Sequence, residues 1–253
     1  MTDSIIDAVL EIQHLKKSFG NNRVLVDINL HLKKGENLVI LGKSGSGKSV
    51  LVKCLEKLIN VDEGKLVVLG KDIASLTEDE LNEIRKKTGF LFQGSALYDS
   101  MTVRENLEFP LRDKKNDFFA DGNDPKEHIN SLVEEVLNNV GLIEAIGKMP
   151  SELSGGMRKR VALARTLILK PEIIFYDEPT TGLDPITAKE ISKLVIEVQK
   201  KYNTSSIIIT HDIECAKIVA NRIIVLKDGK CAAEGTFKEL EESKDKWVRS
   251  FFE

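Results

Sequence analysis

The octapeptide GKSGSGKS, residues 42–49, constrains the fold more than any other feature of this sequence. It follows a short apolar run at 37–41 and precedes a segment with apolar residues at helical spacing, at positions 50, 51, 54, 55 and 58. It matches G-x-x-x-x-G-K-[ST] in full, and a setting between a strand and a helix is the one that this pattern requires. The sequence therefore predicts an α/β domain with a phosphate-binding loop.

The residue types of this loop suit a nucleotide. Glycines let backbone N–H groups converge on phosphate oxygens, and the following helix adds positive charge at its N-terminus. Lys48 is expected to reach the β- and γ-phosphates and Ser49 to bind Mg²⁺. The alternative is a flexible Gly/Ser turn before a helix. We assign the whole stretch to nucleotide binding: Gly42, Lys43, Ser44, Gly45, Ser46, Gly47, Lys48 and Ser49.

Two adjacent carboxylates, Asp177 and Glu178, follow the apolar run at 173–176. Burying an unpaired charge is costly, so the pair implies a nearby cation, which a Mg²⁺–nucleotide would supply. Asp177, on a strand expected to lie beside the phosphate loop, is predicted to hold the metal. Pro179 biases Glu178 toward an extended backbone, and we predict that Glu178 is the general base that activates water. The alternative is a surface acidic pair that opens a turn.

Short apolar runs recur along the chain, several of them separated by helix-length segments, which is typical of a largely parallel sheet covered by helices. Alternating apolar residues at 24–32, with the run at 8–13 before them, predict an antiparallel β region. Residues 94–165 are predicted to form a mainly helical subdomain, with helical patterns at 131–142 and 157–169. The polar segment 112–128 is predicted to be a surface loop.

Composition restricts the class of protein. Lys and Arg number 37 against 40 Asp and Glu, a balance that argues against dependence on a nucleic-acid backbone. Cys54, Cys215 and Cys231 lack disulfide or zinc spacing and are expected to be reduced. No apolar run approaches the roughly 20 residues of a membrane helix, and the acidic N-terminus does not resemble a signal peptide. A cytoplasmic chain is expected.

A second anion site is suggested by Ser154, which precedes two glycines at the start of a predicted helix. A hydroxyl, backbone N–H groups and a positive helix end are presented together there. Alone, Ser-Gly-Gly is more typical of an ordinary N-cap and turn. The longer stretch LSGGMRKRVALAR, residues 153–165, resembles the signature sequence of ATP-binding cassette (ABC) ATPases, and its place between the phosphate loop and Asp177 also matches.

This resemblance implies a P-loop NTPase of ABC ATPase type, with a mostly parallel core sheet, an antiparallel β subdomain and a helical subdomain. The single domain 1–253 would comprise a RecA-like core at 1–93 and 166–240, the signature subdomain at 94–165 and a tail at 241–253. It also implies a head-to-tail homodimer with two ATPs between the subunits. The residues that would contact the partner's ATP or cross the interface are Ser154, Gly155, Gly156, Met157, which stands where many members have Gln, and Asp184 of the D-loop at 182–184.

Three further residues are similar to family positions. Phe19 lies where the family places an aromatic ring against adenine, although a core Phe at a strand end is the alternative. Gln93 resembles the Q-loop glutamine, which touches Mg²⁺ and water and relays the nucleotide state to a membrane partner. His211 follows an apolar run and resembles the switch histidine that contacts the γ-phosphate. All motifs occur in family order from residue 19 to 211.

The resemblance implies docking onto separate membrane permease subunits. Leu97, Tyr98, Met101, Val103 and Leu107 are candidates to line a groove for a helix of the permease, or they simply pack the helical subdomain.

Segments 95–98 and 248–252, SALY and VRSFF, resemble those of the ATPases of Mla (maintenance of lipid asymmetry) transporters, which serve MCE-domain proteins. This implies phospholipid transport on the cytoplasmic face of a bacterial inner membrane, with an accessory subunit and no nucleic acid. The 112–128 loop and the end at residue 253 depart from that pattern. An amino-acid importer, a lipoprotein-release or cell-division ATPase, and a non-transport ABC ATPase are the alternatives, and the substrate and direction stay open.

Overall fold

The computed structural model describes residues 7–114 and 124–252. Ten strands form one sheet in the order β5-β4-β1-β2-β10-β9-β3-β8-β7-β6. The strands are β1 (Ala8–Phe19), β2 (Asn22–Lys33), β3 (Asn37–Gly42), β4 (Glu63–Val68), β5 (Lys71–Asp72), β6 (Thr88–Leu91), β7 (Ile173–Asp177), β8 (Ser205–Thr210), β9 (Arg222–Lys227) and β10 (Lys230–Gly235).

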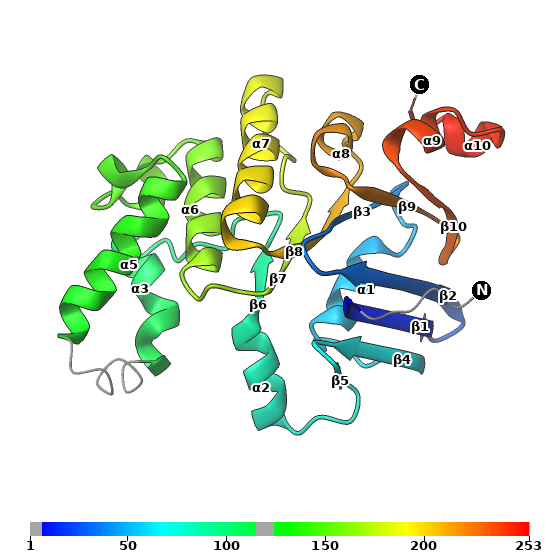
Figure 1. The fold of residues 1–253 in the computed structure, drawn as a ribbon, viewed down its shortest axis with the longest axis horizontal. Coiled ribbons are helices and arrows are strands. Elements are labelled where there is room, and N and C mark those ends of the chain that lie inside the picture. Colours follow the sequence, from blue (N-terminus) through cyan, green and yellow to red (C-terminus); the bar gives the residue numbers. More distant parts are fainter. Residues whose placement is uncertain (1–6, 115–123, 253) are drawn as a thin grey trace.

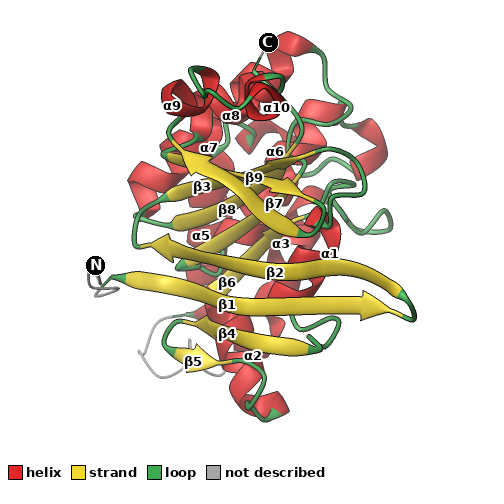
Figure 2. Ribbon diagram, turned by 90° about the vertical axis from the view of Figure 1, so that its right-hand side faces the viewer, coloured by secondary structure: helices red, strands yellow, loops and turns green. Residues whose placement is uncertain are grey.

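The sheet has a parallel and an antiparallel part. Strands β6, β7, β8, β3 and β9 are parallel to their neighbours within this series, whereas β1 pairs antiparallel with β2 and β4. The predicted mostly parallel core sheet and the predicted antiparallel β region are therefore both confirmed. Figure 2 shows the antiparallel strands running across the lower half of the sheet.

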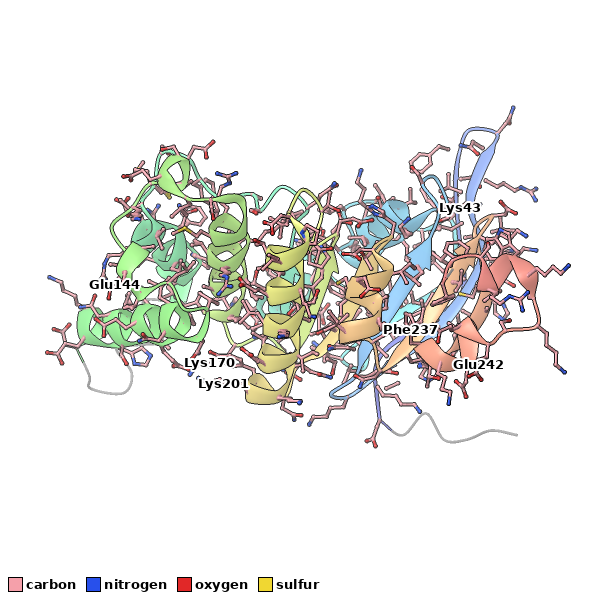
Figure 3. All side chains as sticks on the ribbon, turned by 90° about the horizontal axis from the view of Figure 1, so that it is seen from above. Lys43, Glu144, Lys170, Lys201, Phe237 and Glu242 are labelled. Atoms are coloured by element: carbon pink, nitrogen blue, oxygen red, sulfur yellow. The ribbon has the colours of Figure 1, made fainter. Side chains whose placement is uncertain are left out.

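Helices flank the sheet, and those of the central sequence gather at one end of the molecule (Figure 1). From above, the molecule is elongated, with Glu144 toward one end and Glu242 toward the other (Figure 3). None of the helices in the described ranges is long and apolar enough to cross a membrane. The helices are α1 (Lys48–Leu55), α2 (Glu78–Lys87), α3 (Val103–Glu108), α5 (Pro125–Asn139), α6 (Gly155–Leu167), α7 (Pro185–Tyr202), α8 (Ile213–Val219), α9 (Phe237–Glu241) and α10 (Lys246–Arg249), with short 3₁₀ turns at Phe109–Lys114, Ile143–Ala145 and Pro150–Glu152.

The core lies on both faces of the parallel part of the sheet. In β3, Val39 and Leu41 belong to one buried cluster, while Leu38 and Ile40 belong to the cluster on the other face. Successive side chains of a strand point to opposite faces, so a strand covered on both sides is apolar throughout. All six residues of β3 are buried, which fixes the strand that leads into the phosphate loop.

Three local expectations need correction. Helix α1 ends at Leu55 because Lys57 adopts a left-handed backbone, so Leu58 is 59% exposed and not part of the helix. The predicted 112–128 loop is too long. A 3₁₀ turn continues to residue 114, and α5 begins at residue 125 with Asp124 as its N-cap. Residues 115–123 lie outside the described residues. Val103 and Leu107 are fully buried and pack the core, so they do not line an open groove.

Candidate nucleotide-binding site

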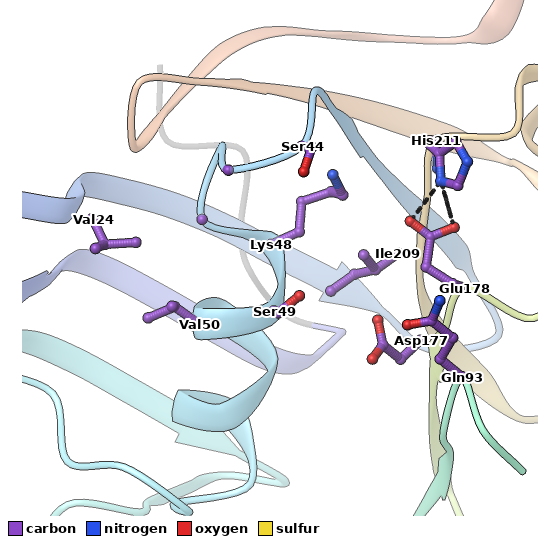
Figure 4. A pocket seen from close by; sticks show the side chains of 12 residues that line it. Val24, Ser44, Lys48, Ser49, Val50, Gln93, Asp177, Glu178, Ile209 and His211 are labelled. Carbon is purple, nitrogen blue, oxygen red and sulfur yellow. Dashed lines mark hydrogen bonds and ion pairs between the residues drawn. The ribbon is translucent and has the colours of Figure 1, made fainter. Parts of the chain in front are cut away.

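A pocket of about 450 Å³ lies where β3, β7 and β8 end, the edge at which parallel sheets bind ligands. It brings together the predicted phosphate loop, both adjacent carboxylates, Gln93 and His211. Strand β8 separates β7 from β3, so Asp177 lies one strand further from the loop than expected, because β3 takes β8 and β9 as its neighbours. The lining residues are Val24, Ser44, Gly45, Gly47, Lys48, Ser49, Val50, Gln93, Asp177, Glu178, Ile209 and His211 (Figure 4).

The phosphate loop needs its last glycine for both conformation and space. Gly47 has φ 102°, and a Cβ there would meet Leu25 Cδ2 at 2.8 Å and Val24 O at 3.1 Å. Gly47 is also the N-cap of α1 and provides no side-chain acceptor for the helix. The first N–H groups of α1 are thus left for a ligand, which the positive end of a helix favours when the ligand is an anion.

Lys48 supplies the cation of the loop. Its buried Nζ donates to Gly42 O at 2.6 Å and to Lys43 O at 3.1 Å, so the ammonium is held against the loop. Burial lowers the pKa of Lys48, and the charges of Glu178 and Asp177 oppose that shift. Ser46 does not line the pocket, and its buried hydroxyl has no partner within the described residues. The uncapped helix end and the ammonium fit a polyphosphate.

Oxygen donors for a metal lie in the same pocket. Ser49, Gln93 and Asp177 contribute a hydroxyl, an amide and a carboxylate to its wall. Mg²⁺ prefers such oxygens and is commonly held by one or two carboxylates together with substrate phosphates. Burial raises the pKa of Asp177, and the neighbouring Glu178 raises it further. A bound cation would relieve both effects, so the donor set fits Mg²⁺.

Glu178 and His211 form the most closely bonded pair of the pocket. His211 Nδ1 lies 2.9 Å from the Glu178 carboxylate, as the dashed lines in Figure 4 indicate. The Glu178 side chain is 13% exposed, whereas that of His211 is 65% exposed. Thr181 Oγ1 and Thr210 Oγ1 also donate to Glu178, at 3.2 and 3.3 Å. The carboxylate is therefore fixed in direction before any substrate arrives.

The backbone of Glu178 differs from the expectation. Its φ is 50°, in the left-handed region, although an extended conformation is usual before a proline. Glu178 N donates to Ile209 O at 2.8 Å, which ties the residue to the end of β8 in this conformation. A residue held in such a region costs about 1–3 kcal/mol and persists only where its surroundings enforce it, most often at functional sites.

The remaining predicted residues lie outside the pocket. Phe19 is 50% exposed with Lys17 Nζ 5.5 Å from its ring, so the alternative of a core Phe is wrong. Ser154 caps α6 by accepting from Met157 N at 3.2 Å, and Asp184 caps α7 by accepting from Thr187 N at 3.1 Å. The predicted residues that do not line the pocket are Gly42, Lys43 and Ser46 of the phosphate loop, and Phe19, Ser154, Gly155, Gly156, Met157 and Asp184.

The sequence reasoning missed a buried lysine that bonds to two residues of the pocket. Lys159 is 4% exposed, and its Nζ donates to Gln93 O at 2.5 Å and to Glu178 O at 3.3 Å. A signal was present, because Lys159 shares the buried face of α6 with residues 162, 163 and 166. A lysine in an apolar stripe is rarely buried without a specific partner.

The chain is similar to several known proteins. A model of the ABC transporter family matches residues 25–181. The methionine import ATP-binding protein MetN of Clostridium tetani is 38% identical over 92% of this chain and 70% of that protein. The intermembrane phospholipid transport system ATP-binding protein MlaF of Haemophilus influenzae is 37% identical over 96% of this chain and 89% of that protein. A dimeric structure of the ATP-binding cassette MJ0796 with ADP and phosphate has a TM-score of 0.78 and 33% identity, and covers 90% of this chain and 98% of that one.

Proposed function

The chain belongs to the ABC transporter family as an ATPase subunit that binds ATP with Mg²⁺, and we propose that it hydrolyses ATP in the pocket between Lys48 and Glu178. One observation carries this proposal. Lys48, Ser49, Asp177 and Glu178 line a single pocket, although the two pairs lie far apart in the sequence. The pocket thus combines a phosphate cradle with a candidate general base.

The phosphate loop and the N-terminus of α1 bind the nucleotide. Lys48 and the N–H groups at the start of α1 hold the β- and γ-phosphates. Ser49, Gln93 and Asp177 would hold Mg²⁺, which when bound neutralises phosphate charge and orients the γ-phosphate. Phe19, exposed at the end of β1, is available to stack on adenine.

Hydrolysis falls to Glu178. Its carboxylate accepts a proton from the attacking water, so that the water oxygen bonds to the γ-phosphorus and ADP leaves. His211, 2.9 Å away, keeps the carboxylate oriented and faces the γ-phosphate side of the pocket. Because Thr181 and Thr210 also hold the carboxylate, little reorganisation is needed at the moment of reaction.

A second copy of the chain completes the site in this proposal. Ser154 is exposed at the N-terminus of α6, and its hydroxyl accepts one bond from Met157 N. A hydroxyl that accepts one bond still has its own hydrogen to donate, here to the γ-phosphate of the ATP on the other subunit. Asp184, at the start of α7, lies near the exposed Ile186, which is available for the interface. The similarity to the dimeric MJ0796 structure supports this arrangement.

The surface proposed for a permease helix is a groove of about 250 Å³ beside the pocket. Its wall includes Leu58 and Phe92, large apolar side chains that are 59% and 40% exposed. Exposed apolar residues that line one hollow are typical of a binding site for an amphipathic helix. Phe92 directly precedes Gln93, so a permease helix bound at Phe92 would lie one peptide unit away from a residue of the nucleotide pocket.

Phospholipid transport with an MCE-type system, from the cytoplasmic face of a bacterial inner membrane, is the proposed role. The chain is 37% identical to the phospholipid-transport relative, and its segments at 95–98 and 248–252 resemble those of such ATPases. Methionine import is the second candidate, because the two identities are similar. Copurification from native membranes decides between them: an MCE protein with a permease supports lipid transport, and a periplasmic amino-acid receptor refutes it.

The hydrolytic site is tested with Glu178→Gln. Since Gln cannot take the proton, turnover should fall by about 100-fold or more while ATP binding persists. The trapped ATP should make the variant dimeric in size-exclusion chromatography with light scattering, and adding Ser154→Ala should weaken that dimer. Glu197→Gln, an exposed change on α7, is the matched control. Hydrolysis by Glu178→Gln at the rate of the control would refute the assignment.

A further inference from the structure

A buried lysine joins the signature helix to the ends of two strands. Lys159 extends from α6, and its ammonium donates to the backbone carbonyls of Gln93 and Glu178 at 2.5 and 3.3 Å. Gln93 follows β6 and Glu178 follows β7, and these two strands are parallel neighbours. The ammonium therefore connects the peptide units at the carboxyl ends of two adjacent strands.

Both carbonyls belong to residues that the proposed reaction uses. Gln93 is assigned to Mg²⁺ and water, and Glu178 is assigned as the general base. The Glu178 carbonyl precedes Pro179, and the residue is held in a left-handed conformation that its sequence position disfavours. Its N–H donates to Ile209 O, and its carbonyl accepts from Thr181 N and from Lys159 Nζ, both at 3.3 Å. Lys159 is the contact among these that comes from another subdomain, on α6.

Filling the core does not explain a lysine at this position. A methionine of similar length would pack there without the cost of desolvating an ammonium. Burial lowers the pKa of Lys159, whereas the charges of Asp177 and Glu178 favour its protonated form. Lys159 thus lies near the two carboxylates of the pocket, and it bonds to the backbone of one of these residues, Glu178.

We propose that Lys159 is a positioning residue for ATP hydrolysis, which holds the backbones of Gln93 and Glu178 in their working positions and links them to the helix that carries Ser154. The proposal rests on the role given above to Glu178. A movement of α6, whose N-terminus would contact the partner's ATP, is then transmitted to the general base of the same chain. Lys159 itself does not touch the reacting atoms.

Two substitutions of Lys159 test this role. Lys159→Met removes both hydrogen bonds, and because a misplacement of about 1 Å can cost 10²-fold, kcat should fall about 10- to 100-fold. The dissociation constant for MgATP, measured with a fluorescent analogue, should change less than about threefold because Lys48 still holds the phosphates. Lys159→Arg keeps the charge and the donors, and should restore kcat to within about threefold of the wild type.

Arg160→Met is the matched control. Arg160 is the next residue of α6, is partly buried, and donates to Val140 O at 3.2 Å and to Glu190 at 2.7 Å, away from the pocket. Its replacement should lower the melting temperature without lowering kcat at a temperature where the variant is folded. If Lys159→Met does not fold, Lys159→Gln is measured in its place, since its amide can reach only one carbonyl.

The outcomes separate this proposal from the proposed function. Loss of kcat at unchanged affinity, with rescue by arginine, supports the positioning role. Wild-type kcat in Lys159→Met, while Glu178→Gln is inactive, overturns the role of Lys159 and leaves the hydrolytic site intact. A loss that arginine does not rescue and that Arg160→Met reproduces makes Lys159 merely structural. Full activity of Glu178→Gln would instead refute the proposed function.

Discussion

The second glycine of the signature, Gly156, should be required for the close approach of two helices. A Cβ added to Gly156 in α6 would lie 2.5 Å from Cγ2 of Thr187 in α7, a separation that real Cβ atoms do not show. The next atom, Thr187 Cβ, is 3.9 Å away, which is an ordinary contact. The clash of Gly156→Ala therefore involves a single methyl group, and Thr187→Ser removes that group. Serine keeps the hydroxyl that donates to Asp184 at 2.6 Å.

The expected free energies of unfolding follow from this geometry. Alanine is about 1 kcal/mol better than glycine in a helix interior and gains less at Gly156, the second residue of α6, whereas overpacking costs about 1–3 kcal/mol, so Gly156→Ala should destabilise by up to about 3 kcal/mol. Thr187→Ser loses one partly buried methyl and should cost about 0.5–1 kcal/mol. When Thr187→Ser is already present the clash is absent, so adding Gly156→Ala should stabilise by up to about 1 kcal/mol. The coupling between the two changes is then about 1–3 kcal/mol.

Urea denaturation of the four proteins, followed by tryptophan fluorescence, measures this coupling. The slope of free energy against urea should stay constant, so that midpoints report stability alone. A coupling below about 0.5 kcal/mol would refute the steric explanation, since such a value is usual for independent sites. Measuring ATP-dependent dimerisation of the same variants in the Glu178→Gln background distinguishes an effect on packing from an effect on phosphate binding. If the double variant is stable but no longer dimerises with ATP, Gly156 also serves the partner's nucleotide.

Three further predictions concern stability, thiol reactivity and nucleotide affinity. Arg222→Met leaves Glu36 without the guanidinium that binds it at 2.8 and 2.9 Å and should cost about 3 kcal/mol at pH 7 by urea denaturation. Burial opposes ionisation of Glu36, but the bonds and charge of Arg222 together with the bond from Lys33 N outweigh it and lower the pKa of Glu36 below the usual 4.5, so this loss should shrink as the pH falls below 4.5; a constant loss from about pH 7 to 3 would contradict the assignment. Burial raises the pKa of Cys54 and Cys215 to about 11, so neither should react with a disulfide reagent at about pH 7 until urea unfolds the chain; rapid labelling of Cys54 or Cys215 in the folded protein, with the labelled residue located by mass spectrometry because Cys231 is only partly buried, would refute this. Lys48→Met should weaken MgATP binding about 10- to 100-fold in a fluorescence titration, and unchanged affinity would remove Lys48 from the site.

Features governed by local chemistry could be predicted from the sequence. The phosphate loop is one contiguous stretch, and the sequence pattern itself specifies its glycines, Lys48 and Ser49. The antiparallel strands β1 and β2 follow from alternation of apolar residues along one hairpin. The meeting of Asp177 with the loop also followed, because the carboxyl ends of parallel strands share one edge of a sheet.

Features that depend on packing between distant segments could not be predicted. Helical spacing extended α1 to Leu58, but the chain leaves the helix after Leu55, before the left-handed Lys57. Apolar residues at 103 and 107 suit both a groove for a permease helix and a packed core, and only the fold shows that Val103 and Leu107 face the core. The two acceptors of Lys159 lie 66 and 19 residues away in sequence, so no local pattern identifies them.

The preference for an extended backbone before proline fails at Glu178, and the reason lies in the geometry of the pocket. Side chains of consecutive strand residues point to opposite faces, so an extended Glu178 would direct its carboxylate away from that of Asp177. A left-handed residue turns the chain immediately after β7, and both carboxylates then line the same pocket. Proline at 179 disfavours this turn, which makes the conformation dependent on the bonds from Glu178 to Ile209 and Lys159. The strain is located at the proposed general base, and it is maintained by contacts from β8 and α6, the elements that also lead to His211 and Ser154.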